Sequence, residues 1–198
     1  KNNGATPAFV ASQNGHTEVL TLLLKKGADV NLATNDNDTT PAFMASQNGH
    51  TVVLALLLEK GADMNLAKNN GVTPAFIASK RGHTDVLALL LEKGADINLA
   101  KNDGTTPAYI ASQNGHTEVL ALLLERGADV NMAKNNGSTP LIAASEKGHI
   151  DVVRVLLKSG VNQSSRSHGK VVFYRCVHEP RKIQLLTCYF PPVPACSV

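Results

Sequence analysis

The chain has 198 residues, of which 43% are hydrophobic and 18% are charged, and its formal net charge is +3 at pH 7. This hydrophobic content is that of a folded protein, and so small a net charge excludes an extended, self-repelling chain. The longest uninterrupted apolar run, Val52 to Leu58, is too short to cross a membrane, so we expect no membrane insertion. The three cysteines all lie near the C-terminal end and form no disulfide framework, which favours a reducing intracellular location, cytoplasmic or nuclear.

Internal repetition is the dominant feature of the sequence. The dipeptide Thr-Pro occurs five times, with its proline at positions 7, 41, 74, 107 and 140, and Gly-His recurs in step with it. The first interval is the longest, because it contains one additional residue, Thr34, and the period is constant after it. These motifs divide the chain into an array over residues 1–163 and a tail over residues 164–198. The repeats cover about residues 1–33, 34–67, 68–100, 101–133 and 134–163.

Each repeat has the pattern of a helix, a turn, a second helix and a loop. In the first repeat, Thr6 can cap a helix that starts at Pro7, and Gly15 is typical of a left-handed helix end. Thr17 can cap a second, leucine-rich helix, which Gly27 ends. Asn-Gly and Asp-Gly pairs in the loops predict tight turns with a positive φ at glycine. Helices of about two to three turns are unstable alone, so neighbouring repeats must stack to bury the leucine faces.

The third repeat shows the full pattern of the unit. It contains Thr73-Pro74-Ala75-Phe76, then Gly82-His83, then a leucine-rich run over residues 86–91, then Gly94-Ala95-Asp96-Ile97-Asn98. This pattern resembles an ankyrin repeat, and the resemblance covers residues 1 to about 163 in five copies. It implies an all-α solenoid of helix-turn-helix units with hairpin-like loops.

One position departs from the family's pattern. The family usually has Thr-Pro-Leu-His at the start of the first helix, whereas here the histidine position holds an apolar or aromatic residue in every repeat: Phe9, Phe43, Phe76, Tyr109 and Ile142. The Thr–His hydrogen bond at that corner therefore cannot form. We expect apolar packing between the helices to replace it without changing the fold.

The two ends of the array differ in character. The fifth repeat has Gly160-Val161-Asn162 in place of Gly-Ala-Asp and carries Arg154 and Lys158 in its second helix, as a partial polar cap would. The first repeat instead has an apolar outer face that includes Val10 and Leu22, and the chain begins with lysine rather than methionine. We therefore expect the chain to be a fragment, with further repeats upstream.

The recurring polar residues favour structural roles over catalysis. Stacked helices lie about 8–10 Å apart, whereas zinc needs ligands at about 2.0–2.1 Å, so the Gly-His histidines of adjacent repeats cannot share an ion. Ser12, His16 and Glu18 offer a nucleophile, a base and an acid, but they recur in nearly every repeat and lack a nucleophile elbow. Asp29 and its equivalents are expected to accept hydrogen bonds from loop N–H groups. We expect no enzymatic activity, no cofactor, no metal ion and no small-molecule substrate.

Residues 164–198 do not match the repeat. They contain all three cysteines and five basic residues against Glu179. Val171–Tyr174 can form a strand and Pro191–Pro194 favours a polyproline II conformation, and we otherwise expect an irregular tail. The spacing of cysteine and histidine fits no common zinc pattern. The basic charges are scattered, which disfavours nucleic-acid binding relative to a solvated tail.

The resemblance implies a protein partner that binds the concave face, which is formed by the loop tips and the exposed sides of the first helices. Carried over repeat by repeat, this face comprises Asn3, Ala5, Gln13, Asn14, Asn37, Thr39, Gln47, Asn48, Asn70, Val72, Lys80, Arg81, Asp103, Thr105, Gln113, Asn114, Asn136, Ser138, Glu146 and Lys147. It is largely uncharged and lacks the Tyr, Trp and Arg clusters that anchor tight interfaces. Lys80 and Arg81 are a basic pair, where we expect an acidic segment of the partner to bind.

The resemblance also implies a modification. An asparagine two positions after the aspartate, with a leucine eight positions before it, resembles the site that an intracellular asparaginyl hydroxylase modifies in many ankyrin repeats. The candidates are Asn31, Asn65, Asn98 and Asn131. A hydrogen bond from such an asparagine to the backbone explains the same residues without any enzyme.

The sequence thus predicts a monomeric, non-catalytic scaffold for protein–protein interaction. A first alternative is that the chain is the recognition arm of a larger enzyme or channel whose functional domain lies outside it. A second places the function in the tail, with the array as a spacer. A third is nucleic-acid binding, which would make the affinity fall steeply with salt.

Overall fold

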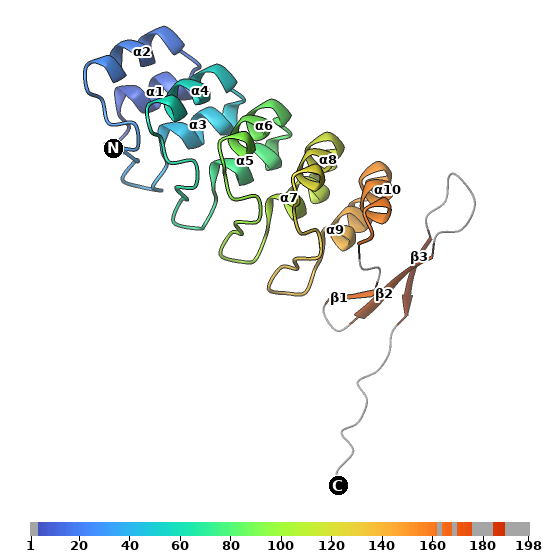
Figure 1. The fold of residues 1–198 in the computed structure, drawn as a ribbon. Helices are drawn as coiled ribbons and strands as arrows, with labels where there is room; N and C mark the ends of the chain where they lie inside the picture. Colours follow the sequence, from blue (N-terminus) through green and yellow to red (C-terminus); the bar gives the residue numbers. More distant parts are fainter. Residues whose placement is uncertain (1–3, 162–163, 168–169, 176–183, 189–198) are drawn as a thin grey trace.

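The computed structural model describes residues 4–161, 164–167, 170–175 and 184–188 (Figure 1). Residues 4–161 form helix pairs that stack side by side along the array, with the loops projecting on one side (Figure 1). The helices are α1 Pro7–Gln13, α2 Thr17–Lys25, α3 Pro41–Asn48, α4 Thr51–Glu59, α5 Pro74–Arg81, α6 Thr84–Glu92, α7 Pro107–Asn114, α8 Thr117–Glu125, α9 Pro140–Lys147 and α10 Ile150–Lys158. The predicted all-α array is confirmed.

The first helix of each repeat begins where the sequence predicts. In the third repeat, the Thr73 hydroxyl accepts the Phe76 N–H at 3.1 Å, and Pro74 is the first helical residue. The helix ends at Gly82, whose φ is 78°. The threonine cap satisfies one of the N–H groups that a helix start leaves without a partner, and the glycine adopts the left-handed conformation at little steric cost.

The second helix of each repeat begins differently from the prediction. In the first repeat, Thr17 is already the first residue of α2, the residue before it is His16, and no side chain caps the helix. The expectation that Thr17 is the cap is therefore wrong. The reason is that the turn is very tight: the Thr17 N–H donates to the Gly15 carbonyl at 3.0 Å.

The Gly-His histidines connect neighbouring repeats. Nε2 of His116 donates to the carbonyl of Lys80, one repeat earlier, at 3.0 Å. His50, His83 and His149 make the same contact to the preceding repeat, at 3.0 to 3.1 Å. These bonds confirm the predicted structural role of the histidines.

The core is a continuous leucine-rich layer between the helices. Leu54, Leu87 and Leu120 occupy the same position in successive repeats, and each is fully buried. A second apolar cluster forms at the start of the first helices and includes Phe43 and Phe76. It confirms the apolar packing expected where the family has histidine, and it lies directly beneath the loops.

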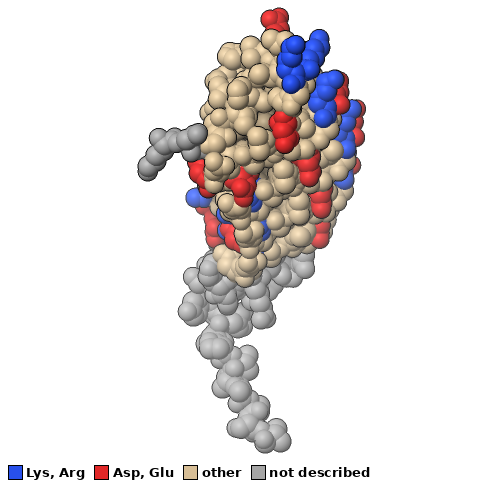
Figure 2. All heavy atoms as spheres, turned by 90° about the vertical axis from the view of Figure 1, so that its left-hand side faces the viewer, with Lys and Arg blue, Asp and Glu red and all other residues tan. Residues whose placement is uncertain are grey.

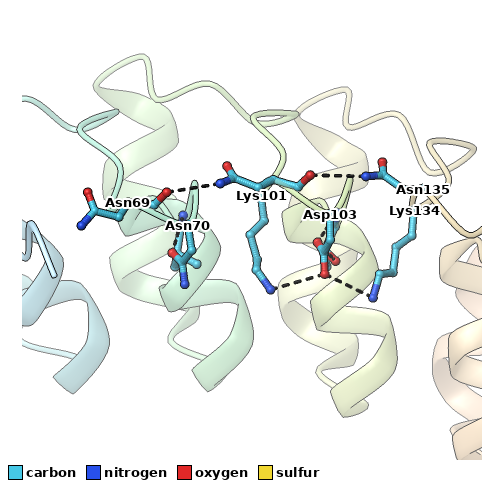
Figure 3. A network of polar contacts seen from close by, with 9 residues as sticks. Asn69, Asn70, Lys101, Asp103, Lys134 and Asn135 are labelled. Carbon is cyan, nitrogen blue, oxygen red and sulfur yellow. Dashed lines mark hydrogen bonds and ion pairs between the residues drawn. The ribbon is translucent and has the colours of Figure 1, made fainter.

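The loops that open the third, fourth and fifth repeats hydrogen-bond to one another in register. In the first of them, the Lys68 N–H donates to the Val72 carbonyl at 3.0 Å. The Asn102 N–H of the next loop donates to the Asn70 carbonyl at 3.2 Å. The side-chain amide of Asn102 donates to the Asn69 carbonyl, also at 3.2 Å (Figure 3). Asn135 repeats this arrangement one loop further along, with its N–H donating to the carbonyl of the fourth-repeat loop at 3.0 Å. These bonds fix the spacing of the loop side chains.

The end of the array at the first repeat is apolar. Val10 is 44% exposed and Leu22 is 60% exposed. The view toward this end shows uncharged atoms over much of its surface, with charged side chains along the right-hand edge and in a second group at the lower left (Figure 2). At the other end, Arg154 and Asp151 form an exposed ion pair at 3.0 Å.

The tail contains three strands: β1 Ser164–Ser167, β2 Lys170–Arg175 and β3 Gln184–Cys188. They form an antiparallel sheet in the order β1-β2-β3, with Phe173 paired to Ser164 and to Leu186. The strand expected over Val171–Tyr174 lies within β2, but the expectation of an otherwise irregular tail is wrong for β1 and β3. Neither is rich in the β-branched and aromatic residues that mark strands in a sequence. The proline-rich segment 191–194 lies outside the described residues.

Candidate protein-binding surface

A hollow of about 350 Å³ lies on the face formed by the loops and the first helices. We call it the basic hollow. It spans repeats two to five and is lined by Phe43, Gln47, Lys68, Asn70, Val72, Phe76, Ile77, Lys80, Arg81, Lys101, Asp103, Thr105, Ile110, Gln113 and Lys134. The loops supply one wall, and helices α3, α5 and α7 supply the other.

The floor of the basic hollow is apolar and rigid. Phe76, Ile77 and Ile110 line it, and they are 4%, 6% and 7% exposed. They belong to the apolar cluster that replaces the family's histidine at this corner. Their packing in the core holds them in place, so the floor is preformed.

The rim of the basic hollow is cationic. It carries five basic side chains and a single carboxylate, that of Asp103; the cations are Lys68, Lys80, Arg81, Lys101 and Lys134. Residues 1–163 as a whole contain 14 basic and 15 acidic residues. The positive charge of the hollow is therefore a local concentration on a nearly neutral array.

The carboxylate of Asp103 forms ion pairs with two of the five cations. It lies 3.3 Å from Nζ of Lys101 and 3.4 Å from Nζ of Lys134, which belongs to the following repeat (Figure 3). The Thr105 N–H donates to the same carboxylate at 3.0 Å, and the Thr105 hydroxyl donates to it as well. The carboxylate thus orients lysines from two adjacent loops toward one point.

These contacts keep Asp103 ionised. Burial raises the pKa of the Asp103 carboxyl, but the hydrogen bonds from Thr105 and Lys101 outweigh burial and hold that pKa well below its usual range. Because this pKa is lowered, the network stabilises the fold at every pH above the ordinary carboxyl pKa. The stabilisation is lost only as the pH falls below that value. The network is partly exposed, so solvent screens it. Near neutral pH its effect is to position the lysines.

The other three cations have no carboxylate partner among the described residues. Nζ of Lys68 lies 5.0 Å from the centre of the Phe43 ring, a cation–π distance. Lys80 and Arg81 are exposed in the last turn of α5, where a positive charge interacts favourably with the helix dipole. These three charges remain available to a ligand.

The structure divides the predicted contact residues into two groups. Eight of them line the basic hollow: Gln47, Asn70, Val72, Lys80, Arg81, Asp103, Thr105 and Gln113. The described residues outside it are Ala5, Gln13, Asn14, Asn37, Thr39, Asn48, Asn114, Asn136, Ser138, Glu146 and Lys147. Asn3 lies outside the described residues.

Several of the predicted contact residues serve the fold instead. Thr39 and Ser138 are 6% and 4% exposed, and the Ser138 hydroxyl lies 3.2 Å from that of Tyr109. The amides of Asn48 and Asn114 donate to backbone carbonyls of the preceding repeat, at 2.7 and 2.9 Å. Burial and these hydrogen bonds give the four residues a structural role within the array, and binding of a partner at any of them stays a prediction.

Sequence analysis missed the three loop lysines of the basic hollow. Lys68, Lys101 and Lys134 lie one repeat period apart, so stacking places them in one column. The signal was present in the repeat period, but the loop residues predicted as contacts began two positions after each lysine. The basic charge of this face was therefore underestimated.

The asparagines proposed for hydroxylation link neighbouring loops. Oδ1 of Asn31 accepts the Asp63 N–H at 2.8 Å, and Asn65 and Asn98 make the equivalent bond at 3.0 Å. Asp63 in turn accepts the Asn65 N–H at 2.8 Å, which confirms the predicted role of the aspartates. Hydroxylation of these asparagines and of Asn131 stays a prediction.

Within the described residues, no cluster of three potential metal ligands is found, and no helix is long and apolar enough to span a membrane.

Comparison with known proteins places the array in a family. The comparison with curated proteins gives no match. The family model described as ankyrin repeats (3 copies) matches residues 8–101 and again residues 98–167. Together with the regularly recurring helix pairs, this match shows that the chain belongs to the ankyrin repeat family, whose members are generally modules for protein–protein interaction.

Proposed function

We propose that this chain is a non-catalytic interaction module that binds a protein partner at the basic hollow. The observation that carries the proposal is the concentration of five cations around an apolar floor, on an array that is otherwise nearly neutral. Interface cores are apolar and enriched in aromatic residues and arginine, and a surrounding polar rim excludes water from them. The basic hollow has this composition, with Phe76 in its floor and Arg81 on its rim.

The construction of the array supports this role. The walls of the hollow come from four stacked repeats, and neighbouring loops among them are joined by backbone hydrogen bonds. A surface that is already ordered loses little conformational entropy when a partner binds. Modest contacts can then give a specific complex.

Charge reversal at Arg81 tests the proposal. We expect Arg81→Glu to abolish capture of a partner by residues 1–198 in a pull-down read by mass spectrometry, because it places a carboxylate on the cationic rim. Lys147→Glu is the matched control. Lys147 holds the equivalent position at the end of α9, is exposed, and lies outside the basic hollow.

A further bait separates the array from the tail. A partner retained by residues 1–163 and by Lys147→Glu, but lost with Arg81→Glu, supports the proposal. A partner captured only by the full chain would place the function in residues 164–198. Equal loss with both charge reversals would show that the basic hollow is not the centre of the contact.

A further inference from the structure

The arrangement of the cations indicates which kind of peptide segment the basic hollow binds. This inference rests on the proposed function. We infer that the basic hollow binds an extended peptide segment in which two acidic residues, four positions apart, flank a central apolar residue on the same face of the peptide. The evidence is the position of the cations at both ends of the hollow and the apolar floor between them.

The two groups of cations lie at opposite ends of α5. Lys68 is on the loop that precedes α5, whereas Lys80 and Arg81 are in the last turn of α5, and these are the cations that have no carboxylate partner among the described residues. The length of α5, at a rise of about 1.5 Å for each residue, separates these ends by about 10 Å. An extended peptide advances about 3.3 Å per residue and its side chains alternate in direction, so carboxylates four positions apart lie on one face, about 13 Å apart. The long, flexible lysine and arginine side chains can reach both, and the residue midway between the carboxylates faces the floor.

The floor explains why the ligand is apolar between its two carboxylates. Phe76, Ile77 and Ile110 lie between the two cationic ends and are nearly fully buried. A hollow of about 350 Å³ has room for side chains but not for a folded domain. The floor residues expose little surface, so an apolar side chain that enters the hollow gains mainly by leaving water itself.

The same features disfavour nucleic acid as the ligand. Nucleic-acid binding depends on many phosphate contacts along a continuous basic track. Here the cations are confined to one hollow, and the array as a whole has more acidic than basic residues. A phosphate backbone would gain little beyond this hollow, whereas a short acidic peptide uses all of it.

Fluorescence anisotropy with defined probes tests the inference on the full chain. The first probe is a fluorescein-labelled peptide Gly-Ser-Glu-Ser-Leu-Ser-Glu-Ser-Gly. The second has glycine in place of the leucine, the third has lysines in place of both glutamates, and the fourth is a labelled single-stranded oligothymidylate. Circular dichroism of each protein variant verifies that the helices are formed.

We expect the first probe to bind, and the glycine and lysine probes to bind at least tenfold more weakly. We expect Arg81→Glu to weaken binding of the first probe at least tenfold. We expect Lys93→Glu, at an exposed position after α6 and outside the hollow, to leave it unchanged. Equal binding of the first two probes, insensitivity to Arg81→Glu, or tighter binding of the oligothymidylate would overturn the inference. If no peptide binds while partner capture still depends on Arg81, the proposed function stands and only the ligand pattern is wrong.

Discussion

Replacing Leu87 by alanine is expected to lower the free energy of unfolding by about 3–5 kcal/mol. Leu87 lies in α6 and is fully buried in the continuous core between the helices. Alanine would leave a cavity that the closely packed neighbouring repeats cannot fill. Urea unfolding followed by far-UV circular dichroism measures the change.

Leu22→Ala is the control for this substitution. Leu22 is also a helical leucine, but it is 60% exposed on the outer face of α2. We expect its replacement to change the free energy of unfolding by no more than about 0.5 kcal/mol. Equal losses for Leu22→Ala and Leu87→Ala would contradict the core as described.

Replacing Gly82 by alanine is expected to destabilise the fold by about 2–3 kcal/mol, and replacing Gly148 by about 1 kcal/mol. Both glycines end a first helix in the left-handed conformation, with φ of 78° and 74°. They differ in their surroundings. A Cβ at Gly82 would lie 2.8 Å from Nδ1 of His116, whereas nothing lies within 4 Å of one at Gly148.

The difference between these variants isolates the histidine contact between repeats. Alanine at position 82 must displace the His116 ring, which then loses its 3.0 Å hydrogen bond to the Lys80 carbonyl. Urea unfolding measures the loss of stability of each variant, and the NMR resonances of the His116 ring show whether the ring has been displaced. Equal destabilisation by the two alanines, with an unchanged His116 signal, would show that this contact contributes nothing.

The predictions that succeeded rest on chemistry within a few residues of the chain. A threonine before proline caps a helix, as Thr73 does, because its hydroxyl reaches an N–H three positions on. Glycine ends a helix, as Gly82 does, because it alone adopts a positive φ without strain. The constant repeat period then extends these local rules to every repeat.

The basic hollow could not be predicted in this way, because its parts meet only through stacking. Lys101 and Lys134 belong to different repeats and converge on one carboxylate, that of Asp103. The sequence shows the column of lysines, but not that it faces the end of α5 across an apolar floor. The start of the second helix was predicted wrongly for a different reason. The turn that follows Gly15 is tighter than the pattern indicated, so Thr17 is already the first helical residue.

Lysine footprinting of the complex with a captured partner tests the central claim most directly. The chain is acetylated with and without the partner, and the extent of modification is read at each lysine by mass spectrometry. Binding at the basic hollow predicts protection of Lys68, Lys80 and Lys101, and unchanged modification of Lys60 and Lys93, which are exposed at the ends of α4 and α6. Protection of Lys60 and Lys93, with Lys68, Lys80 and Lys101 still modified, would contradict it and place the partner on the second helices.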